Sequence, residues 1–166
     1  MKLTTKSLTR AAMIAAIYCV LTVLLQPISY GAIQFRVSEA LTLLPILTVD
    51  AIPGLAVGCL LANLLGGAVW FDVVFGTLAT LLAAICTRLV RKSAPLGAAM
   101  PVLFNGAIVG PVVYFGYVRA PGTPIIWAEL WTTVATVALG EAVVCFILGL
   151  VLIAALKKTP ETLWHD

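Results

Sequence analysis

Ionisable and amide side chains that interrupt long apolar stretches are the residues of this sequence best suited to chemistry. Glu141 lies in the apolar stretch 120–156, whose other charged residue is Glu129, and Asn105 lies in the uncharged stretch 93–118. A charged group at bilayer depth costs roughly 2.5–3.5 kcal/mol to insert and usually serves a function. We therefore predict that Glu141 and Asn105 contact a solute. The alternatives are a structural carboxyl paired with a neighbouring helix and an amide that hydrogen-bonds between helices.

A second polar group lies where a predicted loop leads into a helix. Gln34, Phe35, Arg36 and Glu39 follow one another closely in the sequence. Arg36 and Glu39 are three residues apart, so they could form a solvated ion pair on a helix surface. In the alternative interpretation the loop covers a pocket, and Phe35 and Tyr30 stack on a planar ligand. The sequence leaves both interpretations open.

Two further faces combine small and polar residues at helical spacing. One contains Asn63, Gly66, Gly67 and Trp70, and the other contains Asp72, Phe75, Gly76, Ala79 and Thr80. Small residues allow membrane helices to approach closely, which favours packing of these two faces against each other. Asp72 remains a candidate for solute binding because it is an acidic residue at the start of an apolar run.

Several reactive motifs are absent from the sequence. It contains no G-x-x-x-x-G-K-[ST] motif for nucleotide phosphates, its single histidine is His165, and its four cysteines form no C-x-x-C pair. We therefore expect no enzyme activity, no cofactor and no metal site. A membrane enzyme would have to work with carboxylates alone, and it stays an alternative that a covalent change in an offered ligand would reveal.

The composition requires a lipid environment. Of the 166 residues, 62% are hydrophobic and 10% are charged, and the mean hydropathy is +1.12. Soluble domains are about half apolar and a quarter charged. The chain is therefore predicted to be an integral membrane protein, with the lipid bilayer as its surroundings and no nucleic acid as a partner.

The apolar stretches predict an all-α fold, a six-helix membrane bundle in one domain covering residues 1–166. The expected helices are 8–26, 37–49, 53–69, 72–89, 96–118 and 125–156. Spanning the hydrocarbon takes about 20 helical residues, so 37–49 is expected to be short or tilted. The last stretch would be about 48 Å long as a straight helix, so it must tilt, break or protrude.

Basic residues predict the orientation in the membrane. Six helices would place Lys2, Lys6, Arg10, Arg88, Arg91, Lys92, Lys157 and Lys158 on one side, against Arg36 and Arg119 on the other. Because positive residues accumulate on the cytoplasmic side, both termini are predicted to be cytoplasmic in the plasma membrane. The candidate polar residues then lie toward the outer half, which favours a site loaded from outside.

Small residues four positions apart predict close helix contacts. Examples are Ala11 with Ala15, Ala12 with Ala16, and Gly106 with Gly110. Such pairs give a helix a flat surface against which another helix can pack. The contact could lie within the same bundle or with a partner protein.

Three segments carry a resemblance to a known family. They are residues 30–45 (YGAIQFRVSEALTLLP), residues 53–63 (PGLAVGCLLAN) and residues 72–80 (DVVFGTLAT). Together with the alanine pairs, they are similar to the queuosine-precursor transporter (QueT) family, whose members are substrate-binding S components of energy-coupling factor (ECF) transporters. The similarity covers roughly residues 8–157, and the segment 30–45 is its most specific part.

The resemblance implies a role in solute uptake. The solute would be a 7-deazaguanine, in the 7-cyano or 7-aminomethyl form, or queuine. The partners would be a transmembrane coupling protein and two cytoplasmic ATPase subunits. Ala11, Ala12, Ala15 and Ala16 would face the coupling protein, and the subunit would topple in the membrane to release its cargo inside.

The candidate residues suit a guanine-like solute. A carboxylate of Glu141 or Glu39 could accept two adjacent N–H groups of the base, and Asn105 or Gln34 could bind its carbonyl and ring nitrogen. Phe35, Tyr114 or Trp131 could stack on the base. The alternatives are a solute facilitator or small channel that needs no partner, and an S component for a different vitamin-like solute.

Overall fold

The described part of the chain is entirely helical. The structure is a computed structural model that describes residues 4–26, 35–160 and 164, and these contain no strand. Four apolar helices are long enough to cross a membrane: Thr5–Leu24, Asp72–Leu89, Ala94–Val118 and Trp127–Leu156. Two shorter apolar helices are Val37–Ile46 and Ala51–Leu65. The predicted all-α class is confirmed, whereas the arrangement as six spans and the sidedness of the termini stay predictions.

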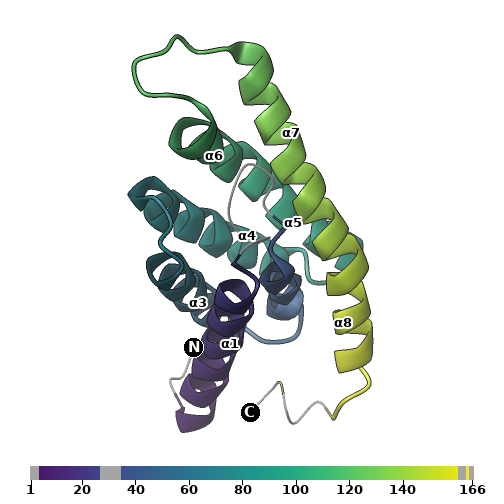
Figure 1. The fold of residues 1–166 in the computed structure, drawn as a ribbon. Helices are drawn as coiled ribbons and strands as arrows, with labels where there is room; N and C mark the ends of the chain where they lie inside the picture. The colour runs from purple at the N-terminus through teal and green to yellow at the C-terminus, as the bar shows by residue number, and fades with distance from the viewer. Residues whose placement is uncertain (1–3, 27–34, 161–163, 165–166) are drawn as a thin grey trace.

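Among the described residues, three of the four long helices combine α-helical and π-helical segments, and the first is α-helical throughout. The first long helix is α1 (Thr5–Leu24), and the second joins η2 (Asp72–Gly76) to α4 (Thr77–Leu89). The third joins α5 (Ala94–Phe104), η3 (Asn105–Val109), α6 (Gly110–Val113) and η4 (Tyr114–Val118). The last joins α7 (Trp127–Val143), η5 (Val144–Gly149) and α8 (Leu150–Leu156). The last helix forms one unbroken rod along a side of the molecule (Figure 1). Of the three outcomes predicted for this stretch, a break is therefore not observed.

The element at the centre of the fold is a 3₁₀ helix. This helix, η1 (Val37–Ile46), has eight buried residues of ten and contains Pro45. It packs against α1, α3 (Ala51–Leu65), α4, α5, η5 and α8. At about 2.0 Å per residue it is near 20 Å long, less than the roughly 30 Å of hydrocarbon. Our prediction of a short helix here is confirmed, although it ends at Ile46, before the predicted Val49.

An arginine side chain caps the C-terminal end of η1, the end that is predicted to face the cytoplasm. The Arg88 side chain of α4 donates through Nη1 to the carbonyl oxygens of Pro45 at 2.9 Å and Ile46 at 3.3 Å. Carbonyls at a helix C-terminus lack intrahelical donors and carry partial negative charge. Arg88 therefore caps η1, which gives this basic residue a structural role beyond its contribution to topology.

The glycines of α3 allow it to lie directly on α1. A Cβ on Gly54 would be 2.7 Å from the Ala11 carbonyl oxygen, and a Cβ on Gly58 would be 2.9 Å from the Ala15 carbonyl oxygen. Figure 1 shows the two helices side by side. Because these glycines carry no Cβ, the two backbones can meet at distances that any larger residue would prevent.

A similar contact joins the third and last long helices. A Cβ on Gly110 would be 2.9 Å from the Cα of Val134, and one on Gly106 would be 3.1 Å from the Cβ of Ala138. The packing predicted for the Gly106–Gly110 pair is therefore observed, between the η3–α6 region and α7. This close approach brings Asn105, at the start of η3, toward Glu141 on α7.

We expect Gly58→Ala to lower the stability of the protein, because the added methyl group would overlap the Ala15 carbonyl and the Tyr18 Cβ. Overpacking of this kind costs about 1–3 kcal/mol. The measurement is denaturant unfolding in detergent, followed by tryptophan fluorescence. Val57→Leu is the control, since it adds one carbon to an exposed position of the same helix. Equal stability of the two variants would contradict this packing.

The turn before α3 is tied to the start of α1 by a buried carboxylate. The Ser7 hydroxyl donates to Asp50 Oδ1 at 2.5 Å, and Arg10 Nη1 donates to Asp50 Oδ2 at 2.8 Å. Burial raises the pKa of Asp50, but these hydrogen bonds and the Arg10 charge lower it by more, so the pKa lies below its ordinary value of 3.8. The ionised carboxylate therefore stabilises the junction of α1, η1 and α3.

The pH dependence of this contribution follows from the lowered pKa. The Asp50 carboxylate stabilises the folded state above pH 3.8, and this stability is lost as the pH falls through its folded pKa. We expect Asp50→Asn to reduce the unfolding free energy at neutral pH by about 1.5–3 kcal/mol, the value of hydrogen bonds to a charged group. The penalty should shrink toward zero in acid. Glu129→Gln, which removes an exposed carboxyl, should show no comparable change; a penalty independent of pH would rule out this explanation.

Candidate functional site

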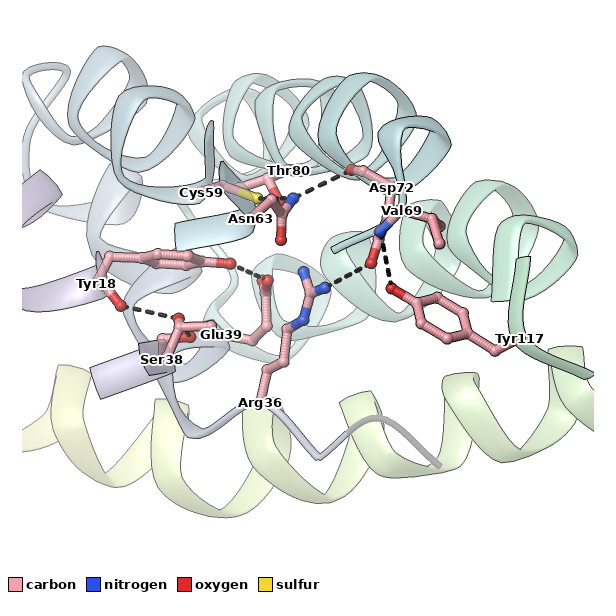
Figure 2. A network of polar contacts seen from close by, with 11 residues as sticks. Tyr18, Arg36, Ser38, Glu39, Cys59, Asn63, Val69, Asp72, Thr80 and Tyr117 are labelled. Atoms are coloured by element: carbon pink, nitrogen blue, oxygen red, sulfur yellow. Dashed lines mark hydrogen bonds and ion pairs between the residues drawn. The ribbon is translucent and has the colours of Figure 1, made fainter. Parts of the chain in front are cut away.

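Buried polar side chains from several elements meet beside η1. Arg36, Glu39, Asp72, Asn105 and Glu141 are each at most 5% exposed. They come from the start of η1, from η2, from η3 and from α7. Figure 2 shows the part of this cluster around Arg36 and Glu39, with Tyr18, Asn63 and Asp72 turned toward it. The structure therefore collects residues from distant parts of the sequence into one polar region inside an apolar body.

An ion pair connects η1 to η2. Arg36 Nη2 donates to Asp72 Oδ2 at 3.0 Å, and the two side chains are 5% and 0% exposed. Desolvating two charges is expensive, and close pairing only offsets that cost when both partners remain in place. We predicted that Arg36 could pair with Glu39 on a helix surface. The solvated form of that pair is wrong, because both residues are buried and Arg36 reaches to Asp72.

Glu39 is held by a tyrosine of α1. The Tyr18 hydroxyl donates to Glu39 Oε1, and Glu39 lies in the first turn of η1, where the partial positive charge of the helix end favours an anion. The other carboxyl oxygen, Oε2, is buried without a hydrogen-bond partner. Glu39 therefore has one oxygen fixed by the protein and one that could accept from a solute.

Glu141, Asn105 and Cys145 lie on the other side of Glu39. The carboxyl of Glu39 is within hydrogen-bonding reach of both the Glu141 carboxyl and the Asn105 amide. The Cys145 thiol also joins the two glutamates, since its Sγ is 3.5 Å from Glu141 Oε1 and 3.7 Å from the Glu39 carbonyl oxygen. The structure thus brings together Glu39, Asn105 and Glu141, which the sequence offered as separate candidates.

Asn63 joins the cluster from α3. Its Nδ2 donates to the Asp72 carbonyl oxygen at 3.1 Å and contacts Cys59 Sγ at 3.6 Å. The two faces that were predicted to pack, those of Asn63 and Asp72, do so. Gly76 makes room for this contact, because a Cβ there would be 2.7 Å from Asp72 Oδ1 and 3.2 Å from Asn63 Nδ2.

The cluster contains several acceptors that lack donors. Glu39 Oε2, Asn63 Oδ1 and Asp72 Oδ1 are buried atoms without a hydrogen-bond partner among the described residues. A buried polar atom that is left unpaired costs about 1–3 kcal/mol. Three such acceptors from three elements are what a solute rich in N–H donors would satisfy. The sequence favoured packing as the role of Asn63, and nothing in its spacing showed that its Oδ1 atom would be unpaired.

Local helix irregularities coincide with the site. Asp72 begins the π-helical segment η2, Asn105 begins η3, and Glu141 lies three residues before η5. A π-helical turn inserts an extra residue into the helix and is frequently found at functional sites. It also rotates the side chains on either side, which a uniform 3.6-residue period does not predict.

The remaining predicted solute contacts are placed differently. Gln34 and Tyr30 lie outside the described residues, and Phe35 is half-buried. Tyr114 is fully buried, and its hydroxyl accepts the backbone N–H of Ile126 at 2.9 Å. Trp131 is 64% exposed. Tyr114 therefore fixes the residue that precedes α7, and Trp131 faces outward. Neither side chain is available to stack on a solute in the polar cluster.

The alanine pairs of α1 divide into two faces. Ala15 is buried and Ala11 half-buried, and the backbone of both lies against the glycines of α3. Ala12 and Ala16 are exposed. The first pair thus makes the contact within the bundle that the sequence left open, while the second pair is available to a partner.

An aromatic groove, which sequence reasoning missed, lies between η2 and the end of the third long helix. Its volume is about 530 Å³, and it is lined by Phe71, Phe75, Ile108, Pro111, Val112, Phe115 and Arg119. The Arg119 guanidinium lies 5.7 Å from the Phe115 ring centroid. Phe71 and Phe75 lie on either side of Asp72 in the sequence, so the groove is lined in part by the helix that supplies one member of the polar cluster. The four-residue spacing of Phe71 and Phe75, and of Phe115 and Arg119, was the available signal.

Comparison with known proteins decides the family. The model of the family described as "QueT transporter" matches residues 8–158 of the chain. The chain belongs to the QueT transporter family. The resemblance seen in residues 30–45, 53–63 and 72–80 is therefore confirmed.

A curated QueT relative supports the same assignment over part of the chain. The "Queuosine precursor transporter QueT" of Lactococcus lactis subsp. cremoris (strain MG1363) is 43% identical over 72 residues, a match that spans 42% of this chain and 42% of that relative. The match thus covers less than half the length of the relative. No solved structure matches the chain.

The Arg36–Asp72 pair makes a testable prediction for this QueT-family chain. Asp72→Asn removes the carboxylate that forms the buried ion pair with Arg36, and we expect a loss of unfolding free energy of about 3–5 kcal/mol. The double variant Arg36→Met/Asp72→Leu replaces both partners by apolar residues and should recover much of the lost unfolding free energy. Unfolding in detergent measures both. Additive effects of the two single substitutions would show that the ion pair is not the interaction that links η1 to η2.

Proposed function

We propose that the chain is the substrate-binding membrane subunit of an ECF-type, ATP-driven importer for a queuosine precursor of the 7-deazaguanine type. Family membership supports a transporter, and the name of the Lactococcus relative supports this solute. The observation that carries the proposal is the buried cluster with three unpartnered acceptors, Glu39 Oε2, Asn63 Oδ1 and Asp72 Oδ1. A solute with several N–H donors is the chemical complement of such a cluster.

The guanine edge of a 7-deazaguanine suits the Glu39 side of the cluster. This edge presents a ring N–H and an amino group side by side, and one carboxylate can accept both in a charge-assisted, bidentate contact. Glu39 or Glu141 supplies that carboxylate. The Asn105 amide, which lies beside both, has donors for the carbonyl oxygen and an acceptor for a further N–H.

The aromatic groove suits the flat faces of the same solute. Phe71, Phe75 and Phe115 line it together with Arg119, and stacking of a base on an aromatic ring contributes about 1–3 kcal/mol. The groove flanks the helix of Asp72, so a planar solute could pass from aromatic contacts to the polar cluster. We include in the proposal that the solute contacts the aromatic groove first and the polar cluster second.

The energy for uptake would come from partner subunits. The sequence has no phosphate-binding motif for ATP, so the proposal assigns hydrolysis to two ATPase subunits and transmission to a transmembrane coupling protein. Ala12 and Ala16 form an exposed small-residue face on α1, which would let a helix of the coupling protein approach closely. Both termini would be on the cytoplasmic side of the plasma membrane, as the basic residues indicate.

The test is binding of 7-cyano- and 7-aminomethyl-7-deazaguanine to the purified protein, measured by calorimetry. We expect Asn105→Ala and Glu141→Gln each to weaken binding about 10- to 100-fold, since hydrogen bonds to charged groups contribute about 1.5–3 kcal/mol. Glu129→Gln is the matched control, because it removes an exposed carboxyl from the same helix. Unchanged affinity in both site variants would exclude this recognition edge, and absence of binding by wild type would exclude the solute class.

The proposal also predicts that transport depends on partners. Proteoliposomes that contain this chain alone should accumulate no labelled 7-deazaguanine, and addition of the coupling protein and ATPases with ATP should restore uptake. Flux without partners would instead establish the alternative of a self-sufficient facilitator. The matched control is the same assembly with non-hydrolysable ATP analogue.

A further inference from the structure

Two carboxyl groups face each other inside the bundle. Glu39 on η1 and Glu141 on α7 are 1% and 5% exposed, and their carboxyls are within hydrogen-bonding reach of one another. Cys145 Sγ lies 3.5 Å from Glu141 Oε1 and 3.7 Å from the carbonyl oxygen of Glu39. Two like charges at this separation in a medium of low dielectric repel strongly, so both groups cannot be ionised together at moderate cost.

The pair and the groups around it together include more carboxyls than cations. Those that lie close to it are Tyr18 of α1, Arg36 before η1, Cys59 of α3, Asn105 of η3 and Cys145 of η5, and Asp72 of η2 is joined to this group through Arg36. Within this described set the cation is Arg36, which forms an ion pair with Asp72. One guanidinium thus serves three carboxyl groups, and full ionisation would leave a net charge of −2 in the bundle.

The unpartnered oxygen of Glu39 is also consistent with a proton on one of the two carboxyls. Glu39 Oε2 is buried without a donor among the described residues. A proton on the Glu141 carboxyl would supply that donor. Glu39 is the better site for the negative charge, because Tyr18 donates to it and it lies in the first turn of η1. Glu141 faces a thiol and an amide, which stabilise an anion less.

We propose that Glu39 and Glu141 share one proton in the unloaded protein, carried by Glu141, and that a cargo bearing a cationic amine displaces it. The exchange rests on the proposed function. In the exchange, the O–H bond of Glu141 breaks and the proton passes to the water outside. The ammonium group of the cationic cargo, in place of its guanine edge, then lies between the two carboxylates. One positive charge leaves as another enters, so the net charge of the cluster stays at −1.

The exchange sets a preference among 7-deazaguanines. A cargo with an amine on its 7-substituent can supply the replacing charge, whereas the neutral 7-cyano form cannot. The cationic cargo is therefore bound with release of about one proton, and its affinity rises about tenfold per pH unit while Glu141 is protonated. The neutral cargo binds without proton release and with little dependence on pH.

The first experiment needs no cargo. Infrared spectroscopy of the purified protein at neutral pH should show the C=O stretch of a protonated carboxyl, shifted in D₂O. Glu141→Gln should remove this band, and Glu129→Gln should retain it. Glutamine has the size of a protonated glutamate, so the variant is expected to fold. A wild-type spectrum without the band, or a band that persists in Glu141→Gln, would overturn the shared proton.

The second experiment tests the exchange. 7-Aminomethyl-7-deazaguanine is added to the weakly buffered protein with a pH indicator dye, and 7-cyano-7-deazaguanine serves as the neutral comparison. Wild type should release about one proton per bound aminomethyl probe and none with the cyano probe; Glu141→Gln should release none with either. Binding of the aminomethyl probe without release overturns the exchange. If neither probe binds, the proposed function and the exchange both fail, while the infrared result still decides the shared proton.

Discussion

The buried ion pair between Arg36 and Asp72 constrains the rest of this structure. Neither charge can face lipid or an empty apolar interior without its partner. The pair therefore fixes the start of η1 against the start of η2, 36 residues further along the chain. Asn63 reinforces the junction through the Asp72 carbonyl. With that junction in place, Glu39 is directed toward Tyr18 and toward α7, and the polar cluster forms around it.

Close backbone contacts place the surrounding helices near enough for this cluster to form. Gly58 lets α3 lie on α1 beside Tyr18, and Gly110 lets the third long helix lie on α7 beside the Asn105–Glu141 contact. The central element, η1, is a 3₁₀ helix of ten residues, although 3₁₀ runs longer than three or four residues are uncommon. Such a segment has poorer hydrogen bonds than an α-helix, so an element of low intrinsic stability carries Glu39 and directly follows Arg36.

The polar cluster connects the fold to the family. Transporters hold solutes at sites built from irregular helices inside the bundle, where backbone and side-chain groups are shielded from lipid. Here η2 and η3 supply such irregularities at Asp72 and Asn105. The unpartnered acceptors of Asn63 and Asp72 are costly to bury, and the proposed donor-rich solute would offset that cost on binding. Under the proposed function, solute binding and the conformation of η1 would be energetically linked.

The sequence by itself determined the class of protein, the helical segments and most of the polar candidates, because apolar run length and the insertion cost of charged groups are properties of the chain alone. It could not determine which side chains contact one another. The spacing of Arg36 and Glu39 suits a local ion pair, yet Arg36 pairs with Asp72. Glu39 instead contacts Tyr18 and Glu141. Asn63 looked like a packing residue, and Trp131 like a stacking one, because spacing gives a helix face but not what faces it. Only the tertiary structure decides that, since burial of a charge depends on which other helices approach it.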